Sequence, residues 1–83
     1  KQLKKQVDIE KKEHLLVKLD NQFTDNYYID QLNIDEDYVD GFKYYIINDE
    51  TFVSIFSLND KLKTQFKMSE MSVKYNQIVI NEN

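Results

Sequence analysis

Residues 51–68 have the sequence TFVSIFSLNDKLKTQFKM, and the spacing of the apolar residues in this stretch decides the predicted fold. In its second half, 61–68, every even-numbered position holds Leu, Thr, Phe or Met, and every odd-numbered position holds Lys or Gln. Such alternation is typical of a strand with one buried face, and outward Lys residues discourage pairing at a sheet edge. A helix is the alternative, because Asp60 could cap it and Leu62 and Phe66 are four residues apart. The complete alternation favours the strand.

The first half of this stretch, 51–58, is apolar on both faces of a strand. Phe52 and Phe56 fall on one face, and Val53 and Ile55 fall on the other. A strand of this kind is central in its sheet and needs a cover on each side, and a partner or a second copy could supply one of them. Alternating residues also predict strands over 42–48 and 72–80.

Residues 2–23 contain no Gly or Pro and are rich in good helix formers, so they predict a helix. Its core-facing stripe is expected to comprise Ile9, Leu15, Leu16, Leu19 and Phe23. Leu3 and Val7 fall on a different face, so residues 1–8 are expected to project from the body. Residues 24–41 fit either a strand or a helix. A turn or short helix is expected over 35–40, and Gly41 is expected to end it because glycine tolerates a positive φ.

These elements predict one small α+β domain over residues 1–83. Its N-terminal helix, about 2–23, would pack on an antiparallel sheet of three or four strands, at about 42–48, 51–58, 61–68 and 72–80. Cys and Arg are absent, which removes a thiol nucleophile, a thiolate metal site and a bidentate phosphate clamp. The single His14 has no nucleophile motif near it, and the acidic residues lack the spacing of a calcium loop. The sequence therefore predicts no enzyme, no cofactor and no metal site.

Charge is segregated along the chain. Between residues 25 and 50 there are eight acidic residues and one Lys, and five of the six Tyr residues lie in the same segment. Tyr is enriched at binding hot spots, and acidic neighbours steer a basic partner. The sequence thus predicts a partner-binding surface on this segment, comprising Tyr27, Tyr28, Asp35, Asp37, Tyr38, Asp40 and Tyr45. The competing interpretation places two or three of these Tyr residues in the core.

The predicted function is a non-enzymatic interaction or assembly module that docks a basic protein, or a second copy, on this acidic surface. No direct nucleic-acid binding is expected, because that requires a basic surface. In a first alternative, the chain is an extracytoplasmic assembly subunit, because a long N-terminal helix before an antiparallel sheet resembles the layout of pilin-like subunits. Its membrane anchor would precede Lys1. In a second, it is an acidic mimic of nucleic acid from a mobile element. The AT-rich codon usage implied by the composition suits a bacterial or phage-related origin and leaves the compartment open.

Overall fold

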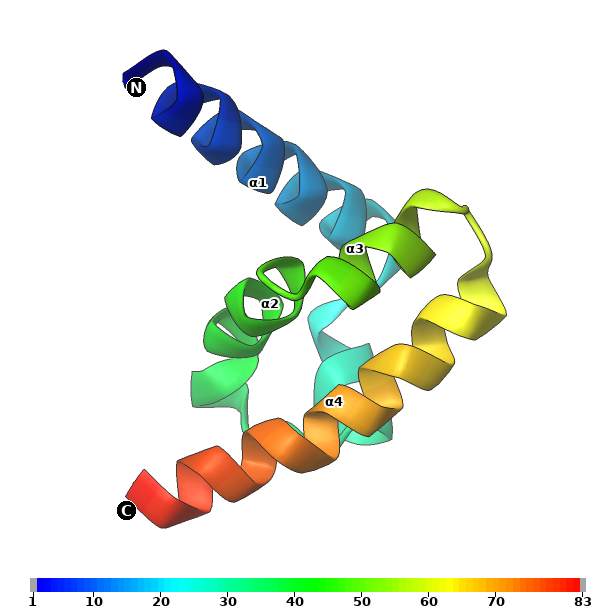
Figure 1. Cartoon of the computed structure of the whole chain (residues 1–83). Coiled ribbons are helices and arrows are strands. Elements are labelled where there is room, and N and C mark those ends of the chain that lie inside the picture. Colours follow the sequence, from blue (N-terminus) through cyan, green and yellow to red (C-terminus); the bar gives the residue numbers. More distant parts are fainter. Residues whose placement is uncertain (1, 83) are drawn as a thin grey trace.

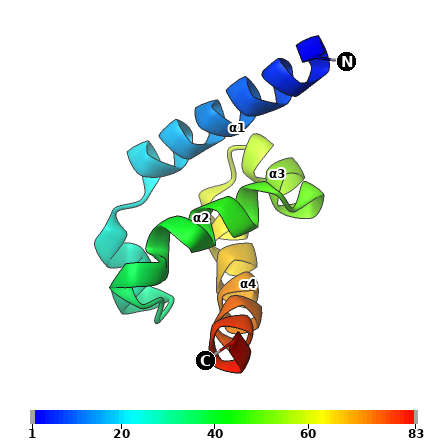
Figure 2. The same ribbon diagram turned by 90° about the vertical axis from the view of Figure 1, so that its left-hand side faces the viewer.

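The computed structural model describes residues 2–82, with the side chains of residues 11–81. Four α-helices and two short helical turns follow one another: α1 (Gln2–Gln22), the π-helical η1 (Tyr27–Gln31), the 3₁₀ turn η2 (Glu36–Tyr38), α2 (Val39–Ile47), α3 (Glu50–Ser57) and α4 (Lys61–Glu82). No strand occurs between residues 2 and 82, so the predicted α+β fold and its antiparallel sheet are wrong, and the chain is all-α. The short helices α2 and α3 lie between the long helices α1 and α4 (Figures 1 and 2).

The segments predicted as strands 42–48 and 51–58 are the helices α2 and α3. Phe42 and Ile46 are fully buried, and they are four residues apart, as Phe52 and Phe56 are in α3. This spacing places each pair on one side of a helix. A short apolar run satisfies the helical and the extended pattern equally well, so its length and its caps decide between them.

The predicted strands 61–68 and 72–80 both belong to the single helix α4. Thr64 and Met68 are buried, whereas the side chains of Leu62 and Phe66 are 78% and 71% exposed. Residues two apart on an α-helix point about 200° away from each other. The strict alternation over 61–68 therefore consists of two stripes of period four on opposite sides of one helix.

Two aspartates, Asp49 and Asp60, are the helix N-caps of α3 and α4. The side chain of Asp49 accepts a hydrogen bond from the backbone N of Phe52 at 2.9 Å. Asp60 accepts one from the backbone N of Lys63 at 3.1 Å, so the helical alternative for this segment was right about the cap. Each such cap contributes about 1 kcal/mol to helix stability.

Gly41 does not stop a helix but lies inside α2, and its φ is not positive. A Cβ atom at this position would collide with the hydroxyl group of Tyr75 from α4. Close contact with α4, and not backbone freedom, is therefore the feature that favours glycine here, because a larger residue would require the Tyr75 side chain to shift. The positive φ values belong to Asn33 and Asn59, which precede η2 and α4.

The predicted N-terminal helix is confirmed as α1. Leu15, Leu19 and Phe23 are buried as predicted and Leu16 is half-buried, while the side chain of Ile9 lies outside the described residues. The N-terminal half of α1 extends away from the other helices in both views (Figures 1 and 2). Among the residues whose side chains the structure describes, Leu15, Leu19 and Phe23 are the ones by which the C-terminal half of α1 enters the core.

Candidate docking surfaces

The acidic, Tyr-rich segment contributes more to the core than its composition suggests. Tyr28 is fully buried, and its ring lies edge-on to the rings of Phe23 and Phe42 at 6.5 and 6.0 Å between centroids. Burial, followed by the nearby carboxylates of Asp20 and Asp25, raises the pKa of the Tyr28 phenol above its ordinary value. Tyr28 therefore does not lie on the predicted partner-binding surface.

Tyr27 and Tyr45 are half-buried and pack against the core. The ring of Tyr27 lies 4.9 Å from that of Phe23, and the ring of Tyr45 lies 5.3 Å from that of Tyr75. Aromatic pairs at these distances stabilise a fold beyond the area that they bury. The competing interpretation placed two or three Tyr residues of this segment in the core. Tyr28 is buried there, and Tyr27 and Tyr45 pack against it.

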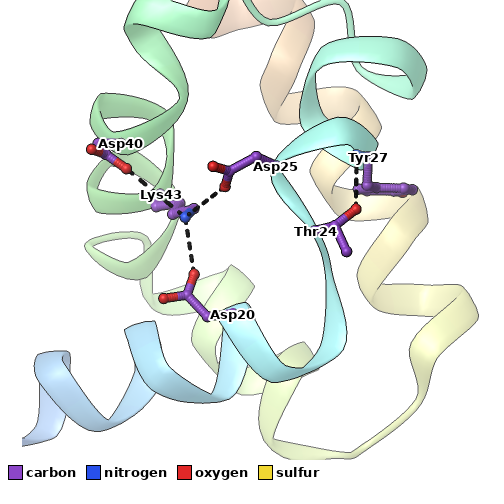
Figure 3. A network of polar contacts seen from close by, with 6 residues as sticks. All are labelled: Asp20, Thr24, Asp25, Tyr27, Asp40 and Lys43. Carbon is purple, nitrogen blue, oxygen red and sulfur yellow. Dashed lines mark hydrogen bonds and ion pairs between the residues drawn. The ribbon is translucent and has the colours of Figure 1, made fainter.

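Three carboxylates surround the buried ammonium group of Lys43 (Figure 3). Its Nζ atom donates hydrogen bonds to Asp20 at 2.9 Å and to Asp25 at 3.2 Å, and it lies 3.9 Å from Asp40. Burial lowers the pKa of Lys43, but the hydrogen bonds and charges of Asp20 and Asp25 outweigh burial and raise this pKa above its ordinary value. The network joins the end of α1, the following loop and α2, so its role is structural.

Four of the predicted partner-binding residues remain exposed: Asp35, Asp37, Tyr38 and Asp40. They lie on η2 and at the start of α2. Asp35 caps η2 by accepting a hydrogen bond from the backbone N of Asp37 at 2.9 Å. The carbonyl of Tyr38 accepts a hydrogen bond from the Tyr75 hydroxyl at 3.4 Å. The structure brings these four together, and it leaves an acidic surface with one aromatic ring that is 36% exposed.

A second surface is the outer face of α4, whose residues were predicted from the sequence to belong to a sheet. We call it the α4 stripe, and it comprises Leu62, Phe66, Val73 and Ile80. These residues are separated by four, seven and seven positions, so they follow one side of the helix. Their side chains are 59–78% exposed. The residues at 64, 68, 71 and 75 pack inward on the opposite side, so α4 is apolar on two opposite faces.

A shallow groove of about 360 Å³ lies beside the α4 stripe. Its apolar walls are Ile55 from α3 and Leu62 and Phe66 from α4, and its rim carries Lys63, Lys67 and Glu70. The ammonium group of Lys67 lies 3.8 Å from the Glu70 carboxylate. The groove is thus an apolar surface with charges of both signs along one edge, as docking surfaces on other proteins are.

No protein-family model, curated protein or solved structure matches this chain. Its function is therefore argued from the side chains that its surfaces present.

Groups that could support catalysis are scattered over the described residues. His14 is exposed on α1, and Ser57 and Ser72 donate hydrogen bonds to the carbonyls of Val53 and Ser69. Among the described residues, no three His, Asp or Glu side chains lie close enough together to hold a metal ion. None of the described helices combines the length and the apolar character needed to span a bilayer.

Proposed function

We propose that this chain is a non-enzymatic protein-interaction module that docks its partner on the α4 stripe and the adjoining groove at α3. The observation that carries the proposal is the outward apolar face of α4, which lies opposite the face that α4 buries in the core. Folding needs only the buried face. The outer face keeps four large apolar side chains in water, and contact with a partner would bury them.

The free energy available from this surface supports the proposal. Full burial of one Leu, Ile, Val or Phe side chain stabilises by about 1.5–3 kcal/mol. Monomeric proteins rarely expose a contiguous apolar patch larger than a few hundred Å², and larger patches mark interaction sites. Phe66 lines the groove and is 71% exposed, and it is the aromatic residue of the α4 stripe, so it is the expected anchor of the interface.

A second candidate is the function predicted from the sequence, the docking of a basic partner on Asp35, Asp37, Tyr38 and Asp40. Its support is that these four residues are exposed within one short segment. Electrostatic steering by such a surface speeds association more than it adds affinity. We place it second, because Tyr27, Tyr28 and Tyr45 contribute their rings to the core instead.

The two other functions considered from the sequence have less support. The resemblance to pilin-like subunits depended on a sheet following the helix, and residues 24–82 are without strands. A mimic of nucleic acid needs a spaced row of free carboxylates, whereas Asp20, Asp25 and Asp40 converge on Lys43.

Site-specific photo-crosslinking in the cells that make the protein tests the proposal. A photoreactive phenylalanine analogue would replace Phe66, Glu36 or Glu13 in the full chain, and all three positions are exposed. We expect discrete crosslinked products from position 66 and none from the control position 13 on α1. Products from position 36 alone would favour the acidic surface. Equal labelling at positions 13 and 66 would refute docking on α4.

A further inference from the structure

The α4 stripe is self-complementary when two copies of α4 are placed antiparallel. We propose that the partner docked on this surface is a second copy of the chain, packed about a two-fold axis between Phe66 and Ser69. This inference rests on the proposed function, and it names the occupant of the same surface. In an antiparallel pair, residues whose numbers have a constant sum face each other, and here that sum is 135.

This register places each larger side chain opposite a smaller one. Leu62 of one copy faces Val73 of the second copy, and Phe66 faces Ser69, which is exposed on α4. The two-fold axis repeats both contacts, so the order across the interface is Leu–Val, Phe–Ser, Ser–Phe and Val–Leu. Close packing of two helices requires large residues to fill the space above small ones. A parallel pair would place Phe66 beside Phe66 and Ser69 beside Ser69, which leaves a gap at the serines.

The charges along the stripe agree with the same register. Lys63 and Glu70 occupy one flank of the stripe, and both line the groove. Their numbers add up to 133, so Lys63 of one copy lies near Glu70 of the second copy, and the symmetry makes this pair twice. Lys67 already neutralises part of the Glu70 charge within each chain. Opposite charges at flanking positions are what set orientation in paired helices.

The length of the stripe fits an isologous contact that extends onto α3. Residues 62 and 73 are about 16 Å apart along a helix that rises about 1.5 Å per residue. Ile80 of the second copy would then pass Leu62 and reach the junction of α3 and α4, where Ile55 lines the groove. Leu58, which is 66% exposed, lies at the same junction. The contact closes on itself, so it predicts a dimer and not a filament.

Disulfide formation between copies tests the register, because the chain has no cysteine of its own. Leu62→Cys and Val73→Cys are made separately and mixed under mild oxidation. We expect a disulfide-linked dimer from the mixture and little from either variant alone. Position 62 of one copy is about 16 Å from position 62 of the second copy, and the same holds for position 73. A disulfide needs Cα atoms within about 7 Å of each other. The matched control mixes Leu62→Cys with Val17→Cys, an exposed apolar position on α1.

Charge reversal gives a second, non-covalent readout by sedimentation equilibrium of the full chain. Lys63→Glu is expected to weaken the dimer by up to about fivefold for each of its two ion pairs. The exchange Lys63→Glu with Glu70→Lys restores the pairs, and it should recover most of the lost affinity. Both positions are exposed, so folding should be unaffected, which circular dichroism checks.

Three results would overturn the inference. A monomer at every concentration up to the millimolar range would exclude the second copy as partner. In that case, crosslinks from position 66 to a different protein would still support the proposed function. Efficient linkage of Leu62→Cys to itself would show a parallel pair. A charge exchange that fails to rescue Lys63→Glu would remove the register from which the two-fold axis was placed.

Discussion

Replacement of Lys43 by Met tests whether the buried ion cluster holds α1, its following loop and α2 together. Met keeps the unbranched stem of Lys43, whose Nζ atom lies 5.5 Å from the centre of the Tyr28 ring. The substitution removes the two hydrogen bonds to Asp20 and Asp25 and the weaker contact with Asp40. The fold thus loses polar contacts while the packing of the stem is retained.

The exposure of the carboxylates sets the magnitude of the effect. The Asp20 and Asp25 side chains are 59% and 71% exposed, so water screens them and each contact contributes about 0.5–1 kcal/mol, below the range for fully buried charge-assisted bonds. Asp40 is 91% exposed, and its contact adds little. We expect Lys43→Met to lower the free energy of unfolding by about 1–2 kcal/mol. Lys43→Ala also removes the buried stem and should cost about 2–4 kcal/mol.

Chemical denaturation by urea at neutral pH measures these values. For a domain of this size, the Met variant should lower the thermal midpoint by roughly 5–15 °C. Two further variants, Asp20→Asn and its combination with Lys43→Met, complete a double-mutant cycle. If the Met variant is as stable as the wild type, or more stable, the cost of burying the ammonium group equals or exceeds its attraction to the carboxylates, and the reasoning is refuted.

The same cluster predicts a loss of stability in alkali. The pKa of Lys43 is raised above its ordinary value of 10.5, so the stability from its charge is complete below that pH and disappears as the pH rises through the pKa of the folded state. The raised pKa of Tyr28 acts in the same direction, because the unfolded phenol releases its proton above about pH 10 while the folded one keeps it. In a Tyr28→Phe background, Lys43→Met should therefore reduce the remaining alkaline loss, to which Tyr27 also contributes because burial raises its pKa. If the dependence of stability on alkaline pH is the same with and without Lys43, the assignment of this loss to the Lys43 charge is contradicted.

Three further substitutions test the packing and the proposed interface. Gly41→Ala should destabilise the wild type, because the new methyl group meets the Tyr75 hydroxyl. In a Tyr75→Leu background the same substitution should stabilise by about 0.5–1 kcal/mol through helix propensity. If urea denaturation shows no such change of sign, the contact with α4 is refuted. Asp49→Ala should lower the free energy of unfolding by about 1 kcal/mol, because α3 loses its N-cap. Asp49→Asn should retain most of that stability, because Asn can also cap a helix. Equal losses in the two variants would show that the cap is not the cause. Phe66→Ser should change the thermal midpoint of the monomer little, because the side chain is 71% exposed, while sedimentation equilibrium should show a dimer at least about tenfold weaker.

Several features of the protein followed from the sequence alone. The N-terminal helix was predictable because its residues have high helix propensity and its apolar positions share one helical face. The breaks between the predicted segments 42–48, 51–58 and 61–68 coincide with the ends of α2 and α3 and the start of α4, although these elements are helices and not strands. The concentration of acidic charge in the middle segment is likewise a property of the sequence, and Asp35, Asp37 and Asp40 are exposed as expected.

Tertiary structure alone decided which side of α4 is buried. The residues at 62, 64, 66 and 68 fit one face of a strand or two opposite faces of a helix, and propensity separates these patterns by well under 1 kcal/mol per residue. Packing of α4 on α2 and α3 selects Thr64 and Met68 for the core and leaves Leu62 and Phe66 in water. It also draws Tyr28 inward and gathers three acids around Lys43. These outcomes depend on contacts between residues distant in the chain, which a local pattern does not encode.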